Sequence, residues 1–376
     1  MKKLTFLLSL AAVLLMGSCA KEDPFGIDSG DKVIYKFTAQ LPGYIDSRAI
    51  GDGECADELF FWVYDENNHE LSALRQHNIA FDNQGHAQVE VPLTPGHTYS
   101  FAFWAQNKNC KAYNPYNPDR IMIDYWGDDE NPVISNDDYR DAFYAFKSNI
   151  TVGTNGQTVQ ETITLRRVFS QLNYGISPEA FNAIKAAGVD LTNARARVKI
   201  SKAYTQFGLL EGEPIEIVDN YVGGETEDEY LTFEFNVMPN GIPNDLLKHV
   251  WWDNPDPDGQ SGWRNYIWLS FNYFLTTVRT ESLINTKIEI ETTDGRVFES
   301  PIFDSRVVQG NYRTNIIADF FTDDVTFNVV IDQNFDDYDH VVDVNVQGVP
   351  STSRRNNNSA IPFYFDVNKL IFNYNK

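Results

Sequence analysis

The sequence predicts an all-β protein, built mainly from antiparallel strands. Polar and apolar residues alternate along many short runs, and this alternation places one set of side chains in a core and the other in water. Clusters of Gly, Asn, Asp and Pro, such as "DNQGH", "TPGHT" and "TTDGR", separate the runs and supply turn geometry. Abundant aromatic residues within the runs supply bulky side chains for a core.

Ten segments carry the strand pattern. In chain order they are "VIYKFTAQL", "LFFWVYD", "QVEVPL", "YSFAFWA", "ETITLRRV", "RVKISKAY", "LTFEFNV", "IWLSFNYFL", "TKIEIETT" and "VTFNVVI". One short helix is predicted in "SPEAFNAIKAAG", with Ser177 as N-cap, Pro178 at the first helical position and Gly188 just past the end. Phe181 and Ile184 share one face of this helix and should pack on a sheet.

A chain of 376 residues can bury one large core, but two domains of about 100 to 200 residues each are the better expectation. We predict a first domain over residues 49–165 and a second over 166–339. Residues 340–376 form a tail, in which polar "SRRNNNSA" precedes the strand-like "IPFYFDVNKLIFNYNK". In this tail Ile361, Phe363, Phe365 and Val367 alternate onto one face. The segment either adds a strand to a neighbouring molecule or pairs within its own domain.

The N-terminus predicts a secreted lipoprotein. Two lysines precede an apolar run from Leu4 to Met16, which is too short to span a membrane and fits a signal peptide over residues 1–18. Small residues directly before Cys19 match the bacterial lipoprotein signal, so Cys19 should become the acylated N-terminus of a lipidated segment, residues 19–48. The alternative is an ordinary signal peptide with an incidental cysteine. "AKEDP" after Cys19 resembles a tag for the outer face of the outer membrane.

Charge excludes one large class of partner. The formal charge is -23, and removal of residues 1–18 takes away two lysines and no acids, which makes it -25. Nucleic acid and anionic membrane surfaces are bound through Lys and Arg, so neither is an expected partner. Beyond Cys19 the chain has Cys55 and Cys110, which form either one disulfide or, as we favour, two buried thiols.

No arrangement of residues indicates catalysis, a metal or a cofactor. The histidines are scattered without ligand spacing, and neither a G-x-S-x-G elbow nor a phosphate loop is present. "DNPDPDGQSG", residues 253–262, resembles half of a calcium loop, but Asn265 stands where the bidentate glutamate is needed, so a solvated acidic turn is favoured. The adjacent acids Asp137 and Asp138 would point to opposite faces of a strand, which makes them poor partners for glycoside hydrolysis.

Two further segments have competing interpretations. Trp251, Trp252 and Trp263 flank the acidic turn and could stack on sugar rings as a glycan-binding site, although the strand pattern of "IWLSF" favours a core role for the aromatic rings there. The linker "GYIDSRAIGDG", residues 43–53, joins the first two predicted strands. It is either a plain hairpin connection with a solvated Arg48 or a protease-sensitive loop.

The order of several motifs resembles a known family. The lipoprotein signal, the first strand, an arginine followed by "AIGDG", then "LFFWVYDENN", "LRRVFSQLNYGI", "ARVKISKAYTQFGLLEG" and "NYRTNIIADFF" look like the fimbrillins of type V pili and their fimbrillin-like surface relatives. The resemblance covers the chain from Cys19 to about Asp337. The long tail and the Trp-rich segment depart from the family pattern.

This resemblance implies two tandem transthyretin-like β-sandwich domains and a structural or adhesive role at the outer membrane, without an enzymatic step. It also implies that an arginine-specific protease cuts between Arg48 and Ala49, which removes the first strand. Other fimbrillin subunits would then be partners by strand exchange, and a host or bacterial surface receptor could be another. The competing hypothesis is a monomeric surface lipoprotein that binds glycans through Trp251, Trp252 and Trp263.

Overall fold

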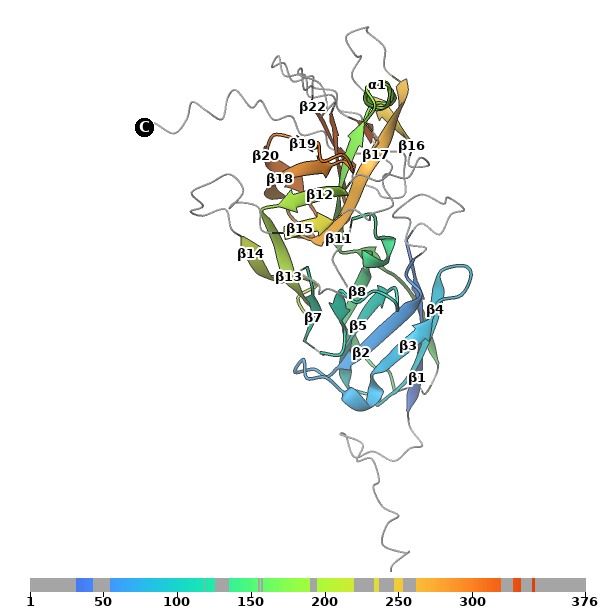
Figure 1. The fold of residues 1–376 in the computed structure, drawn as a ribbon. Helices are drawn as coiled ribbons and strands as arrows, with labels where there is room; N and C mark the ends of the chain where they lie inside the picture. The colour runs from blue at the N-terminus through green and yellow to red at the C-terminus, as the bar shows by residue number, and fades with distance from the viewer. Residues whose placement is uncertain are drawn as a thin grey trace, which may run out of the picture.

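The computed structural model describes residues 32–42, 55–117, 119–125, 135–154, 156, 158–189, 195–219, 233–236, 247–252, 262–318, 327–332 and 340–341. It confirms the all-β class and the predominance of antiparallel pairing. All ten predicted segments contribute to strands. Figure 1 shows β1 to β5 with β7 and β8 at one end of the molecule, β11, β12, β15 to β20 and β22 at the other, and β13 between them.

Two sheets form a sandwich at the N-terminal end. Sheet A has the strand order β4 (His86–Leu93), β1 (Val33–Gln40), β9 (Val159–Thr164). Sheet B has the order β10 (Arg166–Arg167), β8 (Phe143–Thr151), β5 (Thr98–Gln106), β2 (Glu58–Tyr64), β3 (Gln76–Ala80). The short 3-10 helix Ser72–Leu74 lies between β2 and β3. Phe37 and Val89 from sheet A and Phe61 and Phe103 from sheet B belong to one buried apolar cluster between the sheets.

The first two strands do not form a hairpin. β1 pairs antiparallel with β4 and parallel with β9, whereas β2 pairs with β3 and β5 in the opposite sheet. The hypothesis of a plain hairpin connection is therefore wrong. Alternation in the two flanking segments is equally compatible with pairing to distant strands, which local sequence does not reveal. β1 and β2, which the linker joins, thus belong to opposite layers of the sandwich.

The central strands of sheet B, β2 and β5, are buried on both faces. The second face of sheet B carries Trp62 and Trp104, which belong to a second buried cluster. Against this face lies sheet C, with the order β14 (Glu213–Asp219), β13 (Lys202–Gly208), β7 (Arg120–Ile123), β6 (Tyr113–Asn114). The ring centroid of Phe207 on β13 lies 5.6 Å from that of Trp104 and 4.8 Å from that of Tyr144 on β8. This burial explains the nearly continuous apolar runs in β2 and β5.

A second pair of sheets forms the C-terminal end. Sheet D has the order β22 (Phe327–Asp332), β21 (Arg313–Ala318), β11 (Phe169–Ile176), β17 (Gly262–Leu275), β16 (Leu247–Trp252), β23 (His340–Val341). Sheet E has the order β15 (Phe233–Asn236), β12 (Arg195–Ile200), β18 (Ser282–Glu291), β19 (Val297–Glu299), and β20 (Phe303–Val308) also pairs with β18. Leu172 and Tyr174 of sheet D and Ile288 of sheet E share the second buried cluster.

The predicted helix is confirmed as α1 (Pro178–Ala186). The hydroxyl of Ser177 accepts a hydrogen bond from the Ala180 amide at 3.1 Å, which caps the first turn. Gly188 has φ +75°, a left-handed conformation that suits glycine at a helix end. Ile184 is buried and Phe181 packs against the same cluster, as their shared face predicts.

The two ends of the molecule are joined by backbone pairing. In sheet C, Phe207 of β13 is the register partner of Ile121 of β7, so strands from both predicted domains share one sheet. The segment before the 3-10 helix Asp138–Arg140 reaches the edge of β17, where the Asn136 amide donates to the Phe271 carbonyl at 2.9 Å. The hydroxyl of Tyr125 also accepts a hydrogen bond from the Leu275 amide at 2.7 Å. The division between residues 165 and 166 stays a prediction, because β10 at residues 166–167 still pairs with β8.

A buried ion pair lies at this junction. The Nε of Arg167, on β10, is 2.8 Å from both carboxylate oxygens of Asp141, and the two side chains are 0% and 2% exposed. The guanidinium carbon of Arg167 also lies 4.9 Å from the ring centroid of Phe143. Asp141 follows the segment that contacts β17, and Arg167 directly precedes β11. The pair therefore holds together the two chain segments that cross from one end of the molecule to the other.

We expect Asp141→Asn to lower the free energy of unfolding by about 3–5 kcal/mol, because it leaves the Arg167 charge buried without its counter-charge. The loss should affect the whole chain in one transition, measured by guanidinium denaturation with near-UV and far-UV circular dichroism. Glu90→Gln, which breaks the exposed Lys36–Glu90 pair, is the control and should change stability by less than about 1 kcal/mol. A small effect of Asp141→Asn would contradict this role.

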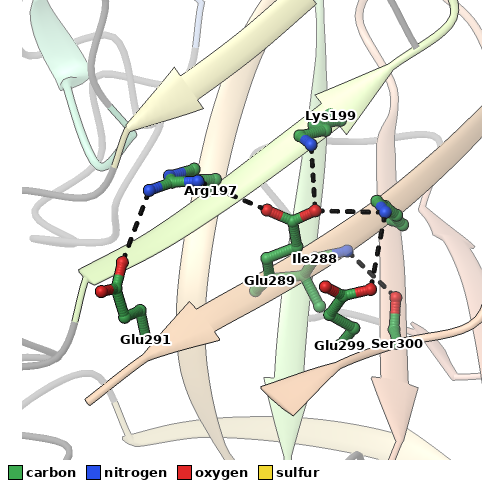
Figure 2. Close-up of polar contacts among 8 residues, drawn as sticks. Arg197, Lys199, Ile288, Glu289, Glu291, Glu299 and Ser300 are labelled. Carbon is green, nitrogen blue, oxygen red and sulfur yellow. Dashed lines mark hydrogen bonds and ion pairs between the residues drawn. The ribbon is translucent and has the colours of Figure 1, made fainter. Parts of the chain in front are cut away.

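The outer face of sheet E carries a network of charged residues, shown in Figure 2. The carboxylate of Glu289, on β18, lies 2.9 Å from Lys199 Nζ, 3.1 Å from Lys287 Nζ and 3.7 Å from Arg197 Nη1. Lys199 and Lys287 are direct cross-strand partners, a like-charge pairing that is unfavourable by itself. The Glu289 carboxylate bridges these two ammonium groups and so compensates their repulsion.

Electrostatics keep Glu289 ionised. Burial alone would raise the pKa of its carboxyl group, but hydrogen bonds from Lys199 and Lys287, together with their charges, outweigh burial and lower that pKa below the ordinary value of 4.5. A carboxyl group whose pKa is lower in the folded state stabilises the fold above its unfolded pKa. That contribution is lost as the pH falls through the folded pKa.

We expect Glu289→Gln to cost about 1–2 kcal/mol at pH 7, because two charge-assisted hydrogen bonds are lost from a side chain that is only 13% exposed. The difference from the parent chain should shrink as the pH is lowered below about 4.5, measured by urea denaturation across pH. Glu291→Gln, on the same strand but with a side chain 43% exposed, is the matched control and should change stability by less than about 0.5 kcal/mol. Equal losses in both variants would contradict the bridging role.

Candidate functional site

The candidate site is the position of β1 within sheet A. All eight residues of β1 have antiparallel partners on β4, from Val33 opposite Leu93 to Gln40 opposite His86. On its other side β1 pairs in parallel with β9, from Tyr35 opposite Val159 onward. In the described part of sheet A, β1 is thus the strand that connects β4 with β9. Figure 1 shows β1 and β4 side by side at the N-terminal end.

Side chains on one face of β1 are fully inserted into the sandwich. Val33, Tyr35, Phe37, Ala39 and the following Leu41 are all buried. The ring of Phe37 lies at the centre, with its centroid 4.8 Å from that of Phe101, 5.4 Å from Phe103 and 5.9 Å from Phe61. These contacts cross from sheet A to sheet B, so β1 contributes directly to the core between them.

Polar contacts fix the register of β1 on its outer face. Lys36 forms an ion pair with its direct cross-strand partner Glu90, and the hydroxyl of Thr38 donates to the side-chain oxygen of Gln88 at 3.1 Å. Beside the strand, burial and the nearby negative charge of Glu161 raise the pKa of the Tyr35 hydroxyl. Sequence analysis did not identify Gln88, Glu90 and Glu161 as neighbours of β1, because they are distant along the chain.

The predicted processing residues lie outside the described residues. Cys19 precedes residue 32, where the description begins, and Arg48 and Ala49 belong to residues 43–54. The described chain on either side leaves sheet A at Leu41 and enters sheet B at Glu58. A cut between Arg48 and Ala49 would therefore sever the covalent connection between β1 and the rest of the sandwich. The tail residues Ile361, Phe363, Phe365 and Val367 also lie outside the described residues.

The three candidate tryptophans occupy strands rather than the turn between them. Trp251 and Trp252 are the last residues of β16, and Trp263 lies near the start of β17. Trp251 and Trp263 are direct cross-strand partners, and Trp252 is opposite Gly262. The backbone thus brings Trp251 and Trp263 together at the end of a hairpin. The acidic turn that resembles a calcium loop lies outside the described residues, apart from Gly262.

Cys110, Asp137 and Glu289 are described groups whose chemistry could suggest catalysis, and each is unsuited to it. Burial raises the pKa of the Cys110 thiol to about 11, so this thiol is not a ready nucleophile. Cys110 and Cys55 are not joined to each other, and Cys55 is half-buried rather than buried as predicted. Asp137 caps the 3-10 helix Asp138–Arg140 by accepting the Tyr139 amide, which is a structural role. Glu289, with its lowered pKa, is unsuited to donate a proton at neutral pH.

The described residues offer neither a metal-binding cluster nor a membrane-spanning helix. Within these ranges, no group of three or more His, Cys, Asp or Glu side chains is arranged to hold a metal ion. Among the helices of the same ranges, none is both long enough and apolar enough to cross a bilayer.

Three solved structures are similar to the chain at low sequence identity. The tip fimbrial protein Mfa3 from Porphyromonas gingivalis is 16% identical, with 80% of this chain and 99% of that chain covered and a TM-score of 0.37. The fimbrial anchor protein Mfa2 from the same organism is 10% identical, with 79% and 97% covered and a TM-score of 0.38. A Bacteroides thetaiotaomicron protein proposed to bind polysaccharide is 14% identical, with 80% and 96% covered and a TM-score of 0.44.

The family of the chain follows from its sequence. No curated protein matches the chain. One family model, described as a family of unknown function, matches residues 31–359, a range that includes β1, both sandwiches and the start of the tail. The chain therefore belongs to the family of unknown function DUF6562.

Proposed function

We propose that the chain is a structural or adhesive, fimbrillin-like subunit of a bacterial surface fibre. In this proposal the precursor is anchored in the outer membrane through acylated Cys19 and faces outward. Proteolysis between Arg48 and Ala49 releases β1, and the chain then assembles with other fimbrillin subunits by strand exchange. The role requires neither a catalytic step nor a cofactor. A host or bacterial surface receptor would be a further partner.

The single observation that carries this proposal is the place of β1 in sheet A. Without β1, both β4 and β9 would lose their common neighbour and would expose unpaired backbone groups along two facing edges. Phe37 would also leave its contacts with Phe61, Phe101 and Phe103. A groove that is apolar inside and lined by strand edges favours binding of another extended strand.

The linker joins strands that do not pair with each other. Because β1 and β2 belong to different sheets, a cut between them breaks a peptide bond but no backbone hydrogen bond between these two strands. The cut chain could therefore keep its fold until β1 is displaced. The tail residues 361–376 could supply a strand to a neighbouring subunit in the same way, which is the role suggested by the alternation of Ile361, Phe363, Phe365 and Val367.

Limited trypsin treatment of the unlipidated precursor tests the switch. We expect a new N-terminus at Ala49, loss of the fragment that carries β1, and binding of an added peptide with the β1 sequence, residues 32–42, to the cut chain in size-exclusion chromatography with light scattering. Arg48→Ala should abolish both the cut and the peptide binding.

Arg279→Ala is the matched control, because Arg279 is an exposed arginine in the described turn after β17, and its removal should leave the cut at Arg48 and the peptide binding unchanged. A chain that is cut at Arg48 yet keeps its own β1 bound would overturn the proposal.

A second candidate function is glycan binding by a monomeric surface lipoprotein. It is favoured by the direct pairing of Trp251 with Trp263, which brings two aromatic residues to one end of a hairpin. A glycan array on the purified chain tests it. Specific binding that is lost in Trp251→Ala and Trp263→Ala, with Trp252→Ala as a further probe, in a chain that keeps its own β1 bound after trypsin treatment, would favour this alternative over the fibre subunit.

A further inference from the structure

The groove that holds β1 is narrow at one position. Ala39 is 0% exposed, and its direct partner on β4 is a second small residue, Ala87, which is 1% exposed. On the other side Ala39 pairs with Ile163 of β9. Two alanines that face each other and are both sealed from solvent indicate that sheets A and B approach closely here. A larger side chain at position 39 would have to displace packed neighbours.

Two positions before Ala39, the groove requires a large side chain. Phe37 fills the space between three phenylalanines of sheet B, and Tyr35 lies next to it with its ring centroid 5.9 Å from that of Phe37. The inward face of any strand that fills this groove must therefore read aromatic, aromatic, small at alternate positions. Leu41, which is buried, extends this pattern with a further apolar residue.

The tail of the chain does not satisfy this pattern. The segment "IPFYFDVNKLIFNYNK", residues 361–376, contains no Ala, Gly or Ser, so no register places a small residue after two aromatic ones. The best register sets Phe363 and Phe365 at the positions of Tyr35 and Phe37. It then puts Val367 at the alanine position and charged Lys369 at the position of buried Leu41.

The outer face of the groove also disfavours the tail. Lys36 of β1 supplies the positive charge opposite Glu90. In the same register the tail has Tyr364 at that position and Asp366 at the position of Thr38, on the same face and close to Glu90. This contribution is small, because the Lys36–Glu90 pair is exposed, but it acts in the same direction as the mismatch inside.

We propose that the groove of this chain accepts a strand from a different protein rather than the tail of a second copy. The partner strand is extended, carries two aromatic residues and then a small one at alternate inward positions, and has a basic residue between the aromatic ones. Assembly through this groove is then heterotypic, and the chain does not polymerise with itself. This inference rests on the proposed function, since it specifies the partner of the same groove.

The first test measures the groove in the full chain, where β1 is the occupant. Ala39→Val should lower the thermal unfolding midpoint by about 3–8 °C, because overpacking outweighs the better strand propensity of valine. Thr38→Val is the matched control, because it also introduces valine, but on the outer face, and it should shift the midpoint by less than about 2 °C. Equal shifts in the two variants would overturn the narrow-groove argument.

The second test exchanges the whole strand in the full chain. Replacing residues 33–41 by the tail sequence 361–369 should lower the midpoint more than Ala39→Val does. Keeping alanine at position 39 and leucine at position 41 in this chimaera should recover most of the loss. A chimaera as stable as the parent chain would show that the tail fits the groove and would overturn the proposal. If no chimaera folds, Ala39→Val against Thr38→Val decides.

The third test measures assembly after cleavage at Arg48. The cut parent chain alone should give no oligomers built through its tail, and the double variant V367A and K369L should gain them. Formation of such oligomers by the parent, lost on deletion of residues 356–376, would overturn the inference and leave the strand-exchange function intact. If cleavage does not release β1 in any variant, the strand-exchange function is wrong. The first two tests do not depend on cleavage and still decide whether the groove requires a small residue at position 39.

Discussion

Burial of the central strands of sheet B on both faces is the constraint on which the rest of the molecule depends. These strands, β2 and β5, place Phe61 and Phe103 against sheet A and Trp62 and Trp104 against sheet C. Because sheet C combines strands from both sides of the predicted domain division, the apolar layer around Trp104 extends without interruption into the C-terminal sandwich. The buried Arg167–Asp141 pair lies where the chain crosses this layer. The two halves of the molecule thus share one buried apolar cluster.

Much of the fold could be predicted from the sequence because its signals are local. Alternation identified all ten strand segments, and the cap at Ser177 with Gly188 located α1. The pairing of strands could not be predicted in the same way, since residues such as Phe207 and Ile121 meet across long stretches of chain and nothing in their own segments specifies the partner. The assumption that consecutive strands form a hairpin failed at β1 and β2 for this reason.

In the candidate site, too, local features could be predicted from the sequence, whereas features that depend on strand pairing could not. The importance of the first strand and of Arg48 could be proposed from a family resemblance, but the features that define the groove could not. Nothing in their own segments distinguishes Ala39 and Ala87. They restrict the size of the groove because they are cross-strand partners and both are buried. The role of a charged residue can also depend on strand pairing. Glu289 bridges two ammonium groups only because Lys199 and Lys287 are cross-strand partners.

The parallel pairings of β1 with β9 and of β11 with β21 have a consequence for how the chain folds. In each sandwich an early strand is completed by one synthesised much later; Asn173 and Asn315, which join β11 to β21, are 142 positions apart. Loops of this length must close before these contacts can form, so folding is expected to be slow and dominated by non-local pairing. We therefore expect each sandwich to reach its native topology only after β9 or β21 has been synthesised.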